Sequence, residues 1–377
     1  MIFPNYNRSI LSTTASILRH FGVNSLFPTL PEVDAALATG PKHVALVLAD
    51  GAGVRPMEKN LPDGAYLRRM RAATVTSVFP STTTAAITTY YAGQSPLEQG
   101  WLGWSLYFKE YAADGVTFLR KTFYTGKDID GPQPATALMP YESIFEKIRR
   151  GRPEVKTITQ YAFPTYAEHG AEVNLRFSTL HQLCENIRNI AREPRPTFSI
   201  SYWAEPDASM HQYGVSSAQA RAQFRLLNDE MEALSRQITD TLLIVTADHG
   251  LIDGRFVEQT DYPDITECLW MPPMVEMRAA AFYVKPYRRV QFENAFRAHF
   301  GADFLLLSRE EVLEKGLLGR GTPHRKIDDF IGDYLACATG SACMSYTLPG
   351  QKKTPMAAVH AGLTEDEMLV PVMLHRR

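Results

Sequence analysis

The sequence predicts an α/β protein, a three-layer sandwich with a largely parallel central sheet and with cap regions inserted into it. Two observations lead to this fold class. Four short segments of the 377-residue chain are mostly apolar, as strands are when a parallel sheet is covered on both faces. Helical patterns lie between these segments, and the alternation is typical of βαβ units. We expect a single domain that comprises residues 1–377.

The strands and helices can be assigned in chain order. Near the N-terminus, Ile10, Leu11, Ile17 and Leu18 predict an amphipathic helix. The four strand candidates are residues 43–49, 155–160, 197–203 and 241–247. Helices are expected at residues 85–92, 143–150 and 217–237. The last of these has an apolar stripe formed by Ala218, Ala222, Phe224, Leu227, Met231 and Leu234.

Two regions fit this alternation poorly. Residues 101–140 are rich in aromatic side chains and glycine, and residues 253–354 contain proline-rich and mixed-charge stretches. We expect both regions to be insertions, or a cap, at the functional edge of the sheet.

Bulk composition limits the partners and the compartment. The net charge is −2, so overall charge favours neither nucleic acid nor an anionic membrane. No apolar run reaches the roughly 18 residues that a membrane span needs, and the N-terminus lacks a signal-peptide pattern. The four cysteines are sparse and have no CxxC spacing, which fits reduced thiols in the cytoplasm, although a disulfide between Cys337 and Cys343 is an alternative. We therefore predict a cytoplasmic protein, and the sequence does not indicate its oligomeric state.

Potential metal ligands follow three of the four predicted strands. Asp50 ends the first of these strands, Asp207 and His211 follow the third, and Asp248 and His249 follow the fourth. In open α/β sheets, sites form outside the carboxyl ends of the strands. Each residue alone could belong to an ordinary turn, but three strands that deliver carboxylates and imidazoles to one edge predict a metal site.

Two further segments join this set. His360 lies in the C-terminal stretch AAVHAGL, where a lone histidine would otherwise be read as a structural residue. The run Ser81-Thr82-Thr83-Thr84 precedes the helix expected at residues 85–92. One hydroxyl can cap that helix, which leaves others available, and a helix N-terminus also attracts phosphate.

These motifs together resemble the alkaline phosphatase superfamily, and within it the type I phosphodiesterase/nucleotide pyrophosphatase family. The resemblance covers residues from about 43 to 371, in the family's order. The matching motifs are Asp50-Gly51, Phe79-Pro80-Ser81-Thr82-Thr83, the stretch Tyr202 to His211 with Glu205-Pro206-Asp207, Asp248-His249-Gly250 and His360-Ala361-Gly362.

The resemblance implies an alkaline phosphatase-like catalytic domain that hydrolyses phosphoric esters with two divalent metal ions. One ion is expected on Asp207, His211 and His360, and the other on Asp50, Thr83, Asp248 and His249. Zn²⁺ is the expected metal because it suits these ligands, and Mn²⁺ is the alternative. Thr83 is the implied nucleophile, which forms a phospho-threonine intermediate.

The expected substrate is a small phosphate ester, for which a nucleotide is one candidate. By resemblance, Tyr202 corresponds to a tyrosine that packs against a nucleobase. Residues 100–108 bear aromatic side chains but no cation, so Trp104 is expected to contact an organic substituent, and a diester is favoured over a dianionic monoester. Against a nucleotide, the aromatic residue that follows the nucleophile in the family is replaced by Thr84.

Other functions remain as alternatives. Within the superfamily, the chain could be a phosphomonoesterase or a phosphonate hydrolase. A sulfatase would need a C/S-x-P-x-R motif around one of the cysteines, which is not found, and the tyrosine and Phe-Pro-Ser motifs fit a phosphoglycerate mutase less well. From a different class, the chain could be a non-catalytic binding protein that metal ions stabilise.

Overall fold

The computed structural model describes residues 1–162, 170–351 and 356–376. Its centre is a seven-stranded sheet in the order β2-β17-β8-β1-β7-β5-β6. All pairs from β8 to β6 are parallel, whereas β17 is antiparallel to both of its neighbours. The strand bounds are Arg71–Thr76 (β2), Leu369–Arg376 (β17), Thr241–Thr246 (β8), His43–Ala49 (β1), Thr197–Trp203 (β7), Lys156–Tyr161 (β5) and Val173–Arg176 (β6).

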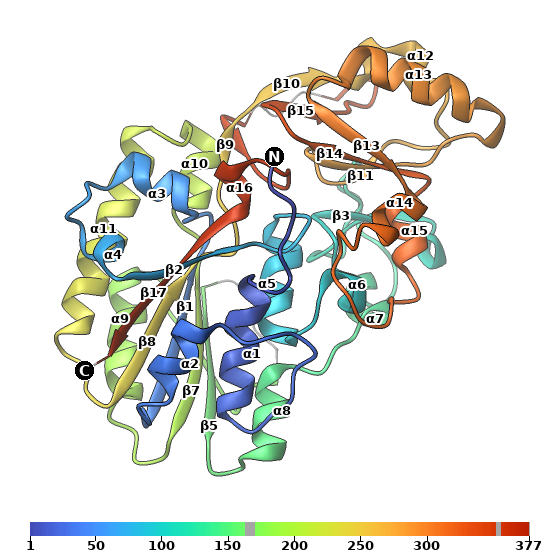
Figure 1. Cartoon of the computed structure of the whole chain (residues 1–377). Helices are drawn as coiled ribbons and strands as arrows, with labels where there is room; N and C mark the ends of the chain where they lie inside the picture. The colour runs from blue at the N-terminus through green and yellow to red at the C-terminus, as the bar shows by residue number, and fades with distance from the viewer. Residues whose placement is uncertain (163–169, 352–355, 377) are drawn as a thin grey trace.

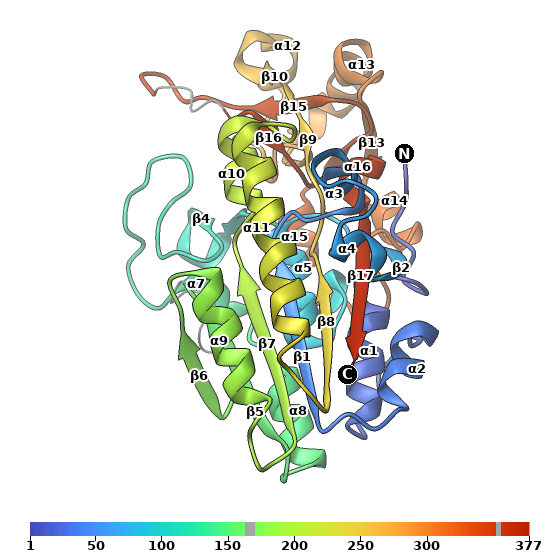
Figure 2. The same cartoon turned by 90° about the vertical axis from the view of Figure 1, so that its left-hand side faces the viewer.

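Helices cover both faces of this sheet and complete the three layers (Figures 1 and 2). One face carries α3 (Val54–Asn60), α4 (Tyr66–Arg69), α9 (Leu180–Ile190), α10 (Asp207–Tyr213) and α11 (Ala218–Ser235). The other carries α1 (Ile10–His20), α2 (Pro31–Leu37), α5 (Thr83–Ala92) and α8 (Ile144–Gly151). The α/β fold class predicted from the sequence is therefore confirmed.

The predicted strands and helices match the observed ones to within a few residues. β1 and β8 are buried along their whole length, as apolar runs at the centre of a doubly covered sheet should be. α8 begins after Ser143, whose side chain and Glu146 form a capping box. α5 begins at Thr83, two residues before the predicted start, because Thr82 is the last residue with extended backbone angles.

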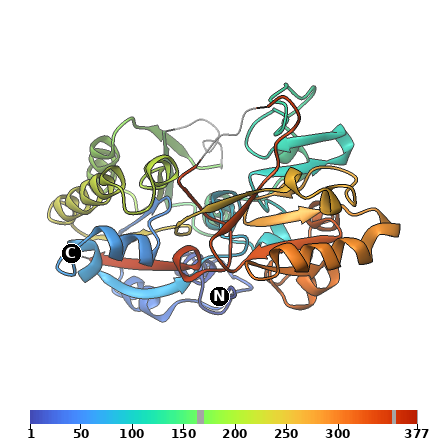
Figure 3. The same ribbon diagram turned by 90° about the horizontal axis from the view of Figure 1, so that it is seen from above.

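The two regions that did not fit the alternation of strands and helices, residues 101–140 and 253–354, contribute strands to one second sheet. β3 and β4, from the first region, join four strands of the second region in a six-stranded sheet with the order β13-β14-β12-β11-β3-β4. Figure 1 shows this second sheet beside the upper end of the central sheet, and Figure 3 shows it from above, to one side of the central sheet. The bounds are Phe304–Ser308 (β13), Tyr334–Ala338 (β14), Ala279–Phe282 (β12), Met274–Val275 (β11), Ser105–Phe108 (β3) and Ala113–Val116 (β4).

Short elements surround the second sheet. The helices are α6 (Pro96–Gln99), α7 (Pro134–Leu138), α12 (Pro263–Thr266), α13 (Arg289–Phe300), α14 (Arg309–Glu314), α15 (Ile327–Ile331) and α16 (Glu365–Met368). Two small strand pairs link the sheets, formed by β9 (Ile252–Asp253) with β16 (Ala358–Val359) and β10 (Arg255–Glu258) with β15 (Ala342–Ser345). Residues 352–354, the end of the second predicted insertion, lie outside the described residues.

The four cysteines are free thiols in buried positions, so Cys337 and Cys343 do not form the alternative disulfide. Among the described residues, no helix combines the length and the apolar character that a bilayer crossing requires.

Candidate active site

Two loops at the carboxyl edge of the central sheet bring the first group of predicted ligands together. Asp50 follows β1, and Asp248 and His249 follow β8, its parallel neighbour. His249 Nε2 lies 3.5 Å from Asp50 Oδ1 and 3.3 Å from Asp248 Oδ2. Gly51 has a φ of +69°, and a Cβ there would lie 2.6 Å from the Leu251 side chain. The turn after Asp50 therefore needs glycine both for its backbone angle and for its close approach to the neighbouring loop.

The second group is centred on Asp207, the first residue of α10. His211 lies one turn later on the same helix face, with Nε2 3.3 Å from Asp207 Oδ2. His360, from the loop after β16, places Nε2 4.0 Å from Asp207 Oδ1. Its ring stacks on that of His249 with centroids 3.9 Å apart, so the two groups are contiguous. Two sets have ligand atoms close enough to share an ion, namely Asp207-His249-His360 and Asp50-Asp248-His249.

Thr83 begins α5 and faces the first group. Its Oγ1 lies 3.4 Å from Asp50 Oδ2 and 3.2 Å from His249 Nε2. Thr82 does not cap the helix with its side chain, and its hydroxyl is directed elsewhere. The structure thus places the predicted nucleophile, among the four consecutive hydroxyl residues, against the candidate ligands.

All three histidines have the same tautomer and orientation. Nδ1 of His211, His249 and His360 lies 2.7, 3.1 and 3.2 Å from the backbone carbonyls of Ala358, Gly250 and Ser81, respectively. A carbonyl oxygen only accepts hydrogen bonds, so Nδ1 carries the hydrogen and the lone pair of a neutral ring is on Nε2. Each Nε2 faces the carboxylates, which is the arrangement of a metal-binding histidine held by its other nitrogen.

Several carboxylate oxygens of the site have no hydrogen-bond partner, and a bound cation would satisfy them. Among the described residues, Asp50 Oδ1, Asp207 Oδ1 and Asp248 Oδ2 are buried and make no hydrogen bond. Burial raises the pKa of Asp50 well above its usual range, and Asp207 and Asp248 raise it further. Burial acts to raise the pKa of Asp207 as well, but His211 lowers it below its usual range. Buried carboxylates with open oxygens, together with three oriented imidazoles, fit divalent ions.

One predicted substrate contact differs from the expectation, whereas another is available. Tyr202 is only 4% exposed, and its hydroxyl donates a hydrogen bond to Asp50 Oδ2. In the structure this side chain therefore holds Asp50 and does not present an open stacking surface. Trp104 is 41% exposed at the start of the first insertion, so its ring is accessible to a substituent.

The site also contains a residue that the sequence did not indicate, Glu276, which follows β11 in the second insertion. Its Oε1 accepts hydrogen bonds from Thr82 Oγ1 and from the Trp104 backbone N–H, both at 2.7 Å. Burial raises the pKa of Glu276 to about 7, and its charge interacts with those of His211 and Asp207. No motif surrounds Glu276 in the sequence, so only the pairing of β11 with β3 brings it to the site.

A buried ion pair, which the sequence also did not indicate, holds the loop of His360. Arg278 and Glu367 form a completely buried ion pair, with Nε 2.6 Å from Oε1. Glu367 Oε1 also accepts from the Gly362 backbone N–H at 2.7 Å, two residues after His360. The pair connects the start of β12 to this loop.

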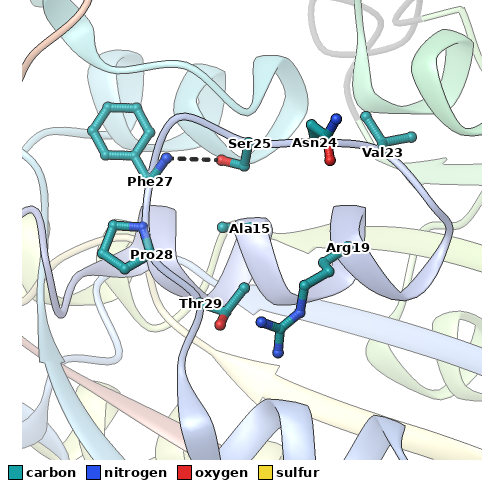
Figure 4. A pocket seen from close by; sticks show the side chains of 8 residues that line it. All are labelled: Ala15, Arg19, Val23, Asn24, Ser25, Phe27, Pro28 and Thr29. Carbon is teal, nitrogen blue, oxygen red and sulfur yellow. Dashed lines mark hydrogen bonds between the residues drawn. The ribbon is translucent and has the colours of Figure 1, made fainter.

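A hollow of about 390 Å³ lies elsewhere, beside α1 and the segment that follows it (Figure 4). Its lining contains none of the candidate ligands. It is formed by Ala15, Arg19, Val23, Asn24, Ser25, Phe27, Pro28 and Thr29.

Comparison with known proteins agrees with the site's chemistry. The sequence model of the type I phosphodiesterase/nucleotide pyrophosphatase family matches residues 44–299. No curated protein matches the chain. Solved structures with a similar fold include an inactive variant of murine ectonucleotide pyrophosphatase/phosphodiesterase 5 in complex with AMP, which has a TM-score of 0.63 and 18% sequence identity over 88% of this chain and 87% of that one. Phosphonoacetate hydrolase from Sinorhizobium meliloti 1021, in complex with phosphonoacetate, has a TM-score of 0.63 and 17% identity over 89% and 90%.

Proposed function

The chain belongs to the type I phosphodiesterase/nucleotide pyrophosphatase family, within the alkaline phosphatase superfamily, and is a phosphoric ester hydrolase; from this premise we propose that it hydrolyses phosphodiesters through a phospho-threonine intermediate on Thr83. One divalent ion would be held by Asp207, His211 and His360, and another by Asp50, Thr83, Asp248 and His249. The observation that carries the proposal is the common orientation of the three imidazoles, whose Nε2 atoms face open carboxylate oxygens.

In this proposal the chain positions the reacting atoms. When bound, the two ions lower the pKa of the threonine hydroxyl, neutralise the leaving oxygen and activate water. Thr83 Oγ1 attacks phosphorus, and the ester oxygen leaves. The backbone N–H groups at the start of α5 stabilise the charge on the phosphoryl oxygens. Water then hydrolyses the phosphoester of Thr83 and regenerates the hydroxyl.

The charges around the nucleophile support a diester substrate. A monoester is largely a dianion near neutral pH, and sites for dianions usually add an arginine beside the metals. Next to the nucleophile, the structure has an acidic side chain, Glu276, which accepts a hydrogen bond from Thr82. A diester carries one negative charge and is repelled less by that carboxylate.

Phosphonate hydrolysis is the second candidate. Thr84, which stands where the family has an aromatic residue after the nucleophile, is buried and offers no stacking surface. The phosphonoacetate hydrolase of Sinorhizobium meliloti was solved with phosphonoacetate, a small substrate without a nucleobase. The murine phosphodiesterase bound AMP, so a nucleotide diester and a phosphonate are both to be tested.

The test is a comparison of kcat/KM for bis-p-nitrophenyl phosphate, p-nitrophenyl phosphate and phosphonoacetate with added Zn²⁺ or Mn²⁺. We expect the diester to give the highest value. A diester value well below that of the monoester would reverse the assignment, and release of phosphate from phosphonoacetate alone would select the second candidate. If the purified protein contains bound metal but hydrolyses none of these compounds, it is a metal-stabilised binding protein.

The cytoplasmic location and the single-domain organisation stay predictions. Cell fractionation tests the first, and one cooperative thermal transition, with no separate step for the second sheet, is expected for the other.

A further inference from the structure

Glu276 lies where three separate parts of the chain meet. Thr82 precedes the candidate nucleophile, Trp104 comes from the first insertion and Glu276 from the second. Both hydrogen bonds that hold the carboxylate go to Oε1. One oxygen is therefore fixed by a side chain and a backbone N–H, which leaves the other for a different partner.

That second oxygen is open. Among the residues that the structure describes, no hydrogen bond reaches Glu276 Oε2 and no lysine, arginine or histidine forms an ion pair with this side chain. Glu276 is partly exposed, so it is not sealed inside the protein. It also lies within electrostatic reach of His211 and Asp207. Among the described residues, the edge of the active site thus carries a carboxyl group without an ion-pair partner.

The backbone around Glu276 is strained. Val275 has a φ of +80°, which is rare for a β-branched residue. It packs on Gly103, where a Cβ would lie 2.7 Å from the Val275 carbonyl oxygen. The turn is closed by a hydrogen bond from the Glu276 N–H to the Ala279 carbonyl at 3.2 Å. Strain of this kind persists where surrounding structure fixes a functional position.

An accessible aromatic ring accompanies the carboxylate. Trp104 donates its backbone N–H to Glu276, and its side chain is 41% exposed. A cation is attracted both by a carboxylate and by the face of an indole ring. The two residues together offer the chemistry that recognises an organic ammonium group.

We propose that Glu276 and Trp104 form a subsite for a positively charged, ammonium-bearing substituent of the phosphodiester. The inference rests on the proposed function, because it specifies the substituent of the same substrate. Glu276 binds the charge and Trp104 provides the apolar, aromatic wall.

The test uses two diesters of equal size and with the same leaving group, p-nitrophenyl 2-aminoethyl phosphate and p-nitrophenyl propyl phosphate. The wild-type protein should favour the ammonium ester in kcat/KM by about tenfold, the scale of one charge-assisted contact. Glu276→Gln should bring this ratio close to one. Glu185→Gln, an equivalent change on the exposed surface of α9, should keep the wild-type ratio. A wild-type ratio of one or less, or a Glu276→Gln protein with the wild-type ratio, would overturn the proposal.

Binding separates this inference from the proposed function. The Thr83→Ala protein, titrated with each diester by calorimetry, should bind the ammonium ester more tightly by a similar factor. If no ester is hydrolysed but this preference is present, the proposed function fails and the subsite stands. If both esters are hydrolysed and bound equally, only the subsite fails. The wild-type and Thr83→Ala ratios also decide the question if Glu276→Gln does not fold.

Discussion

Replacement of Arg278 by methionine should destabilise the protein by about 3–5 kcal/mol, because it leaves the Glu367 carboxylate buried without its cationic partner. Both side chains are completely buried, so solvent screening does not reduce this effect. Arg278 also donates to the carbonyls of Ala342 and Gly340, at 2.7 and 2.9 Å, and these acceptors lose their donor as well.

The magnitude can be expressed as a melting temperature. An unfolding entropy of about 2.1 cal mol⁻¹ K⁻¹ per residue gives about 0.8 kcal/mol per kelvin for this chain, so the expected decrease in Tm is about 4–6 °C. Differential scanning calorimetry with excess Zn²⁺ measures it. Metal binding through His360 should weaken in parallel, since the ion pair holds the loop that carries this residue.

A double-mutant cycle tests the cause. The protein with both Arg278→Met and Glu367→Gln has no buried charge at this position, so it should be clearly more stable than the sum of the two single effects implies. A decrease in Tm below about 1 °C for Arg278→Met, or strict additivity in the cycle, would refute this reasoning.

Three further changes test the active site. Thr83→Ala should retain metal but lose turnover by at least about 10³-fold, because it removes the nucleophile; an active Thr83→Ala protein beside an inactive Thr82→Ala protein would move the assignment by one residue. Chelation should lower the Tm, because the clustered carboxylates then repel one another, and restored Zn²⁺ should reverse the change; a Tm that is insensitive to chelator would argue against bound ions. Gly51→Ala should weaken metal binding in calorimetric titrations, because its Cβ would lie 2.6 Å from the Leu251 side chain and 3.0 Å from that of Asp207; wild-type affinity would show that the loop adjusts.

The sequence predicts the parts of the site that follow directly from strands. Asp50, Asp207 and Asp248 lie immediately after, or within a few residues of, apolar runs, and parallel strands bring their carboxyl ends to one edge. His360 lies far along the chain from the other candidate ligands, but it can still be predicted because its motif has a fixed place in the family's order.

The rest of the site depends on the pairing of strands that are far apart in the chain, which the local sequence pattern does not encode. β11 has two residues and pairs with β3 through a single residue pair, Val275 with Ser105, so neither strand nor partner has a periodic signal. Glu276 is placed by that contact. For Tyr202, the motif identifies the residue but not whether its hydroxyl or its ring faces the site, and in the structure the hydroxyl contacts Asp50.

The last strand of the central sheet has a consequence for the order in which the protein becomes active during synthesis. β17, residues Leu369–Arg376, lies between β2 and β8 and supplies both of them with hydrogen bonds. Among the described residues, β17 is the strand that joins β2, which leads into the nucleophile helix, to β8 and its ligands, so this connection forms only after β17 has been synthesised. Pairings that span most of the chain also form slowly. A nascent chain can therefore form β1, β7 and β8 early, but β2 joins them only once β17 has been made, so a chain truncated before Leu369 should lack a competent site.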